Sequence, residues 1–113
     1  MTPEGRITRT IIRHLKRLRA QGEPIWWHKL AGHPMQAGGI PDLIVCYSGQ
    51  WLLIELKTPG RQPGPRQAYT VQQIQEAGGR VLVADSTETV VEELEDLKCT
   101  WLRLNGGRSS PPT

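Results

Sequence analysis

Residues 39–57 read G-I-P-D-L-I-V-C-Y-S-G-Q-W-L-L-I-E-L-K, and this stretch decides the fold. Two short apolar runs within it, residues 43–47 and 51–54, are rich in strand-forming residues and predict two β-strands. The intervening Ser48, Gly49 and Gln50 are typical of a tight turn. The stretch therefore predicts an antiparallel β-hairpin.

The register of this hairpin determines which polar side chains meet. If residues 48 and 49 form the turn, Asp42 lies opposite Glu55. Opposed residues of an antiparallel pair lie on one face about 5 Å apart, and alternation along the strand brings Lys57 to the same face. If residues 49 and 50 form the turn, Asp42 lies opposite Lys57 instead. Both registers gather Asp42, Glu55 and Lys57 at one end of the hairpin.

Two convergent carboxylates beside a lysine are typical of metal-dependent phosphodiester chemistry. Two carboxylates within a few ångströms repel each other unless a proton or a cation lies between them. Mg²⁺ prefers such oxygen ligands, and a neighbouring lysine can hold a water or offset charge that develops on a phosphate. The alternative is a surface salt bridge at the mouth of a hairpin. The Pro41-Asp42 pair at the matching register favours the functional interpretation.

The rest of the chain predicts alternating helices and strands. A helix is expected from about Pro3 to Gly22, a strand over 25–30, a loop over 31–41 and a second loop over 58–64. A helix from Pro65 to Gly78, a strand over 80–84 and a helix over 87–98 follow, and residues 105–113 are expected to form a disordered tail. This order implies a mixed sheet covered by helices. The pattern alone gives α/β and α+β equal weight.

Several motifs together resemble a known nuclease family. Pro41-Asp42 followed by Glu55-Leu56-Lys57 resembles the PD-(D/E)xK nuclease signature. The ordered set G-G-I-P-D-L-I-V, I-E-L-K-T-P-G, P-x-Q and A-G-G-R-V-L-V is similar to the virus-type replication-repair nuclease (VRR-Nuc) family, especially its small stand-alone members from phages and bacteria. The resemblance runs from about residue 4 to residue 94. It implies an α/β, restriction-endonuclease-like mixed sheet flanked by helices, forming a nuclease domain over residues 1–104.

The resemblance also implies roles for individual residues. The two carboxylates would bind Mg²⁺, which Mn²⁺ can replace, with the backbone carbonyl of Leu56 as a further ligand. Lys57 would position or activate the attacking water. Glu4 would help to hold the metal or its waters, although an acid at a helix N-terminus is also favoured by the helix dipole. Gln67 matches the glutamine of the family and would add an amide near the site; the alternative is a solvated polar residue at a helix start.

The implied activity is that of an endonuclease acting on DNA, with branched or junction DNA as substrate in replication, repair or recombination, and with a homodimer as the assembly. Candidate DNA contacts are Arg61 and Arg66, which flank the site, and three basic residues of the front half, namely Arg9, Arg13 and Lys29. The residues themselves leave two rivals open: a non-catalytic nucleic-acid-binding module, and a nuclease acting on RNA.

Three further side chains have open roles. His28 and His33 could approach DNA or a metal, but neither has a partner at metal-ligand spacing. Trp26 and Trp27 alternate across a strand, so we expect one to be buried. The exposed one could stack on a base or lie in a subunit interface.

Length, charge and cysteine content set outer bounds. The chain has 113 residues, enough for one domain, and a formal net charge of +3. Residues 1–35 carry seven Lys/Arg against two acids, whereas residues 85–113 carry three against six, so the front half suits a polyanion better. The two cysteines lack metal or disulfide spacing, no apolar run reaches about 20 residues, and the N-terminus has no signal-peptide pattern. We therefore expect no membrane association and a reducing cytoplasmic setting, and the family resemblance implies that the cell is bacterial or phage-infected.

Overall fold

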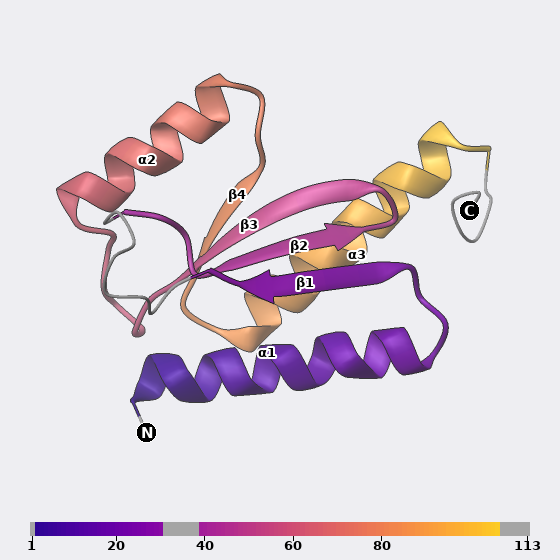
Figure 1. The fold of residues 1–113 in the computed structure, drawn as a ribbon, viewed down its shortest axis with the longest axis horizontal. Helices are drawn as coiled ribbons and strands as arrows, with labels where there is room; N and C mark the ends of the chain where they lie inside the picture. Colours follow the sequence, from indigo (N-terminus) through magenta and orange to yellow (C-terminus); the bar gives the residue numbers. More distant parts are fainter. Residues whose placement is uncertain (1, 31–38, 107–113) are drawn as a thin grey trace.

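A four-stranded mixed sheet organises the chain, with helices on both sides of it (Figure 1). In a computed structural model, which describes residues 2–30 and 39–106, the strands lie in the order β1-β2-β3-β4. The first three strands are antiparallel neighbours, and β4 joins β3 in parallel. The elements are α1 (Pro3–Ala20), β1 (Ile25–Lys29), β2 (Leu43–Tyr47), β3 (Gln50–Leu56), α2 (Pro65–Glu76), β4 (Val81–Ala84) and α3 (Thr87–Leu104). The predicted α/β class with a mixed sheet is confirmed.

The hairpin β2–β3 adopts the first of the two predicted registers. Tyr47 pairs with Gln50, and the ladder runs to Leu43 opposite Ile54. The two turn residues, Ser48 and Gly49, both have positive φ, 51° and 76°. This conformation matches the right-handed twist of the strands in a two-residue hairpin. The position after Leu43–Ile54 is therefore Asp42 opposite Glu55.

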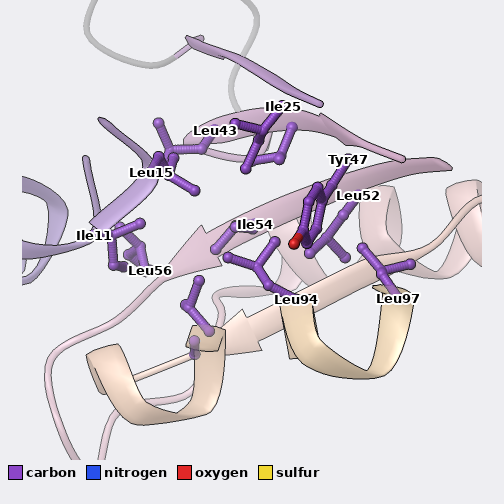
Figure 2. Close-up of a cluster of buried hydrophobic side chains, with 13 residues drawn as sticks. Ile11, Leu15, Ile25, Leu43, Tyr47, Leu52, Ile54, Leu56, Leu94 and Leu97 are labelled. Atoms are coloured by element: carbon purple, nitrogen blue, oxygen red, sulfur yellow. The ribbon is translucent and has the colours of Figure 1, made fainter. Parts of the chain in front are cut away.

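One face of the sheet forms the core with α1 and α3 (Figure 2). Strand alternation sends every second side chain of the hairpin to that face, where they are nearly or fully buried. The helices contribute apolar residues at helical spacing, which Figure 2 shows directed towards the strands. The main contributors are Ile11 and Leu15 from α1, Leu43, Val45 and Tyr47 from β2, Leu52, Ile54 and Leu56 from β3, and Leu94 and Leu97 from α3.

The N-terminal end of α1 is fixed by its capping residues. The Thr2 hydroxyl oxygen accepts a hydrogen bond from the Gly5 N–H at 3.0 Å, and Pro3 occupies the first helical position. The burial of Ile11 and Leu15 against the sheet fixes the rotation of the helix. Glu4 therefore lies in the first turn, at the end of α1 next to the outgoing strand β3.

The helix α2 approaches the opposite face of the sheet, and Figure 1 shows it on the other side of the strands from α1. It forms the crossover between the parallel strands β3 and β4. None of its residues is fully buried, so it is held by half-buried side chains and by its polar contacts. Its N-terminal turn reaches the end of β3 that carries Glu55, since Gln67 contacts that residue.

The last helix is longer than predicted. We expected α3 to end at residue 98, but it continues to Leu104. The reason is Trp101, which continues the buried stripe formed by Val90, Leu94 and Leu97 and is only 7% exposed. Within the two described ranges, no helix is both long and apolar enough to span a bilayer. The expected tail lies almost wholly outside the described residues, as does most of the expected loop before Asp42.

Truncation of Trp101 should show how much this extension contributes. Trp101→Ala removes a nearly buried indole and should lower the free energy of unfolding by about 3–5 kcal/mol. Leu104→Ala, three residues further along at 77% exposure, should change it by less than about 0.5 kcal/mol. Urea unfolding followed by circular dichroism measures both. Equal effects of the two substitutions would contradict the assignment of Trp101 to the core.

Candidate active site

Asp42 and Glu55 lie together where β2 begins and β3 ends. One carboxylate oxygen of Asp42, Oδ2, accepts a hydrogen bond from the Leu56 N–H at 2.7 Å, and the Asp42 carbonyl accepts another from the Leu30 N–H, also at 2.7 Å. Asp42 is thus tied to both neighbouring strands. The Glu55 side chain is 2% exposed although it is on the face away from the main core.

Gln67 connects the acidic pair to the lysine. Its amide nitrogen donates to Glu55 Oε1 at 3.1 Å, while its amide oxygen accepts from Lys57 Nζ at 2.5 Å. Lys57 Nζ itself lies 3.4 Å from Glu55 Oε1. The three side chains form a closed set of contacts from two elements, the end of β3 and the first turn of α2. The lysine is consequently held beside the carboxylates and is not free to extend into solvent.

The electrostatic environment of Glu55 is unfavourable to its charge. Burial and, after it, the nearby Asp42 carboxylate raise the pKa of Glu55 to about 7, against the opposing effect of the Lys57 ammonium. Its second oxygen, Oε2, is buried and has no hydrogen-bond partner among the described residues. A buried carboxylate oxygen without a donor is the group that a bound cation would satisfy.

This donor set suits a hard divalent cation. Glu55 Oε2 and the Asp42 carboxylate supply oxygen ligands, and their mutual repulsion is relieved by positive charge between them. In the described part of the chain, no three His, Cys, Asp or Glu side chains converge as a metal-binding group. The acidic cluster is therefore a pair, and the protein ligands would be completed by backbone oxygen and water, as is common for Mg²⁺.

Glu4 lies beside this pair without joining it. Its Oε1 accepts hydrogen bonds from the Thr58 hydroxyl at 2.8 Å and the Thr58 N–H at 3.3 Å. Glu4, Asp42 and Leu56 line one hollow of about 210 Å³, together with Lys29. Thr58 was not predicted as a site residue, because a threonine after a lysine has no recognisable pattern and only the fold brings Glu4 to it.

Gly39 controls the approach of the Asp42 segment to α2. It has a φ of 92°, and a Cβ at this position would lie 2.9 Å from Thr70 Oγ1 and 3.0 Å from the Arg66 carbonyl. Only glycine combines this backbone conformation with such a close contact. The first turn of α2 and the residues before β2 are thereby packed against each other, which places Gln67 over Glu55.

The remaining candidate residues lie at different distances from the pair. Arg61 is exposed and lines a hollow of about 210 Å³ with Lys57, and Arg66 is exposed in the first turn of α2. Arg9 and Arg13 lie on the exposed side of α1, about 8 and 14 Å along the helix axis from Glu4. They form a separate basic strip there.

The histidines and the tryptophan pair, whose roles the sequence left open, lie in different surroundings. His28 is exposed and stacks on Trp26, and His33 lies outside the described residues. The prediction for the tryptophan pair is confirmed, because Trp27 packs against the core under Arg19 while Trp26 is 48% exposed.

The fold is similar to that of a known nuclease domain. A solved structure described as a VRR_NUC domain is similar to this chain, with a TM-score of 0.66 and 27% sequence identity over 84% of this chain and 97% of that one. No protein-family model matches the chain, and no curated protein matches it. The structural match supports the VRR-Nuc family and its restriction-endonuclease-like fold, as the motifs predicted.

The raised pKa of Glu55 predicts a pH-dependent stability for the metal-free protein. A carboxyl whose pKa rises from 4.5 when unfolded to about 7 when folded stabilises the fold below pH 4.5. That contribution, on the order of 1–3 kcal/mol, should be lost as the pH rises from 4.5 through about 7. Urea unfolding in EDTA across this range should show the loss in the wild type and not in Glu55→Gln. Parallel pH profiles for the two proteins would contradict the assignment.

Gly39 and Gly22 provide a matched test of the contact with α2. Both have positive φ, 92° and 88°, but a Cβ at Gly22 would meet nothing within 4 Å. Gly22→Ala should therefore lower the free energy of unfolding by about 1–2 kcal/mol, because only its backbone conformation is disfavoured. Gly39→Ala should lower it by at least about 1 kcal/mol more, because its Cβ would also clash with α2. Chemical unfolding of both variants measures the difference. Equal costs would show that the segment before β2 is not packed against α2.

Proposed function

We propose that this chain is a metal-dependent endonuclease that hydrolyses DNA phosphodiester bonds, with Mg²⁺ as its cofactor and Mn²⁺ as a substitute. The observation that carries the proposal is the buried Glu55 carboxylate, which has an unpartnered oxygen, lies beside Asp42 and contacts Lys57 both directly and through Gln67. A salt bridge that served only stability would not leave a carboxylate oxygen buried without a donor.

The metal would be held by Asp42, Glu55 and the Leu56 carbonyl. When bound, Mg²⁺ supplies charge neutralisation for the paired carboxylates and polarises a phosphate oxygen. The Asp42 carboxylate is pre-oriented by the Leu56 N–H, and the Glu55 carboxylate by the Gln67 amide. Neither acid needs to reorganise on binding, which is the usual source of electrostatic rate enhancement.

Lys57 is placed to act on the phosphate and on the attacking water. Its ammonium contacts the Gln67 amide oxygen and lies 3.4 Å from Glu55 Oε1, so its charge is fixed at the edge of the acidic pair. There it can orient a water for in-line attack and offset the negative charge of the transition state. Glu4, held by Thr58 in the neighbouring hollow, is a second group that can hold a water or a hydrated ion.

The preference for DNA, and for branched or junction DNA in replication, repair or recombination, follows the likeness to the VRR-Nuc family. A homodimer is part of the same proposal, because two copies bring two sites to a branched substrate. Lys29 and Arg61 support a polyanionic substrate, since each lines a hollow that also contains one of the site residues.

Substitution of Asp42, Lys57 and Gln67 tests this function. Asp42→Ala and Lys57→Ala should each lower the cleavage rate at least about 100-fold, because Asp42 would hold the metal and Lys57 would offset the negative charge of the transition state. Gln67→Ala should lower it about 10- to 100-fold through loss of orientation. Glu92→Gln, an exposed substitution on α3, is the control and should leave the rate unchanged.

Cleavage of labelled duplex DNA, branched DNA and RNA, with Mg²⁺, Mn²⁺ or EDTA, provides the measurement. We expect metal-dependent cutting of DNA, fastest on branched substrates. Cutting of RNA alone would replace the proposal with a ribonuclease, and tight binding without cutting would replace it with a binding module. Metal-dependent cutting that persists in Asp42→Ala or Lys57→Ala would refute the assignment of the site.

A further inference from the structure

The face of the sheet that carries Asp42 and Glu55 continues away from them as an exposed aromatic surface. The strand registers align two further rows on this face, first His28, Ile44 and Leu53, and then Trp26, Cys46 and Trp51. Trp26 is 48% exposed and Trp51 56% exposed. Trp26, His28 and Trp51 are called the aromatic face below. Exposed indoles side by side are costly to hydrate and mark a contact surface.

The rings of the aromatic face are arranged as a platform. Trp26 and His28 are nearly parallel, with ring centroids 6.1 Å apart and an interplanar angle of 9°. Trp51 meets Trp26 edge-on, at 6.2 Å and 76°. These mutual contacts hold the rings of β1 and β3 in place across the intervening β2, so little rotamer entropy remains to be lost when a flat ligand is bound.

A groove adjoins this platform. It has a volume of about 510 Å³ and lies between Trp51, the outer-facing Ile44 and Leu53, and the turn that connects α2 to β4, residues 77–80. The volume is in the range of sites that bind small aromatic ligands. Because Gly78 and Gly79 form the turn, the far wall of the groove is mostly backbone, with N–H and C=O groups that can contact a polar ring edge.

The aromatic face is continuous with the candidate active site. Trp51 precedes Glu55 by four residues on β3, on the same face, which places it about 13 Å away along the strand. At a stacked spacing of 3.4 Å per nucleotide, this distance corresponds to no more than about four nucleotides. A strand with its scissile phosphate at the acidic pair would therefore have its nearby bases over these rings.

The charges on the two sides of the sheet also favour a nucleic acid here. Neither row of the outer face contains an acidic residue, and Lys57 lies at its active-site end beside Glu55. The helix α3 packs on the opposite, core-forming face of the sheet. It carries five acidic residues: Glu88, Glu92, Glu93, Glu95 and Asp96. A polyanion would therefore be repelled by α3 and not by the outer face.

We propose that the aromatic face and its groove bind unpaired nucleotides next to the scissile phosphate, so that the enzyme selects substrates with a single-stranded segment beside the cut. This proposal rests on the nuclease function above and adds a substrate class to it. Bases in a duplex are stacked on one another and cannot lie on protein rings, whereas an unpaired base can stack on an aromatic side chain and add to the affinity.

Binding without cleavage isolates this surface from the chemistry. Fluorescence anisotropy of labelled 12-nucleotide oligo-dT and of a blunt 12-bp duplex, both in EDTA, would be measured for wild type, Trp51→Ala, Trp26→Ala, Trp51→Phe and the control Leu104→Ala. Each Trp→Ala substitution should weaken oligo-dT binding about 5-fold or more and duplex binding less than 2-fold. Trp51→Phe should keep most of the affinity, because a phenyl ring still stacks, and Leu104→Ala should keep all of it.

The outcomes separate this proposal from the proposed function. If the wild type cuts DNA but its alanine variants bind oligo-dT normally, or lose duplex binding equally, the aromatic face is not a base-binding surface. If light scattering shows a dimer that Trp51→Ala converts to monomer, the surface is a subunit interface and the proposal is overturned. If oligo-dT binding depends on Trp51 but no cutting occurs, the nucleotide site stands and the nuclease function fails. Thermal melts of each variant exclude unfolding as the cause.

Discussion

The close approach of two carboxylates, those of Asp42 and Glu55, is the constraint that the rest of the site serves. Glu55 is nearly inaccessible to water and has one oxygen without a donor, so its charge is unfavourable unless something compensates it. The protein supplies part of that compensation through Gln67 and Lys57 and leaves part unsupplied. Such an incomplete arrangement destabilises the free protein slightly, and the cation that we propose would supply the missing compensation.

Much of this arrangement follows from the hairpin sequence. A two-residue turn at Ser48 and Gly49 fixes the register, and strand alternation then assigns Leu43 and Ile54 to the core and Asp42 and Glu55 to the other face. These rules act over short distances, which is why they could be applied before the structure was known. They did not determine where α3 ends, because that depends on whether Trp101 finds space in the core.

Contacts between distant segments were the less predictable part. The position of Gln67 in the first turn of α2 was predicted by family resemblance, but its bridge from Glu55 to Lys57 depends on how α2 packs against Gly39. The hydrogen bond that the Thr58 hydroxyl donates to Glu4 likewise joins residues 54 positions apart. The outward direction of Trp51 follows from the same strand alternation that places Glu55. The outer face thus has the candidate active site at one end and the aromatic face at the other.

We propose that Asp42 and Glu55 together hold a divalent metal ion. Anomalous scattering from crystals soaked in Mn²⁺ tests it most directly, because Mn²⁺ replaces Mg²⁺ at oxygen sites and can be located without reference to activity. If both acids bind the metal, we expect one strong peak about 2.1 Å from both an Asp42 and a Glu55 carboxylate oxygen. A peak confined to other acids, such as Glu93 and Asp96, or no peak near Glu55 Oε2, would contradict it.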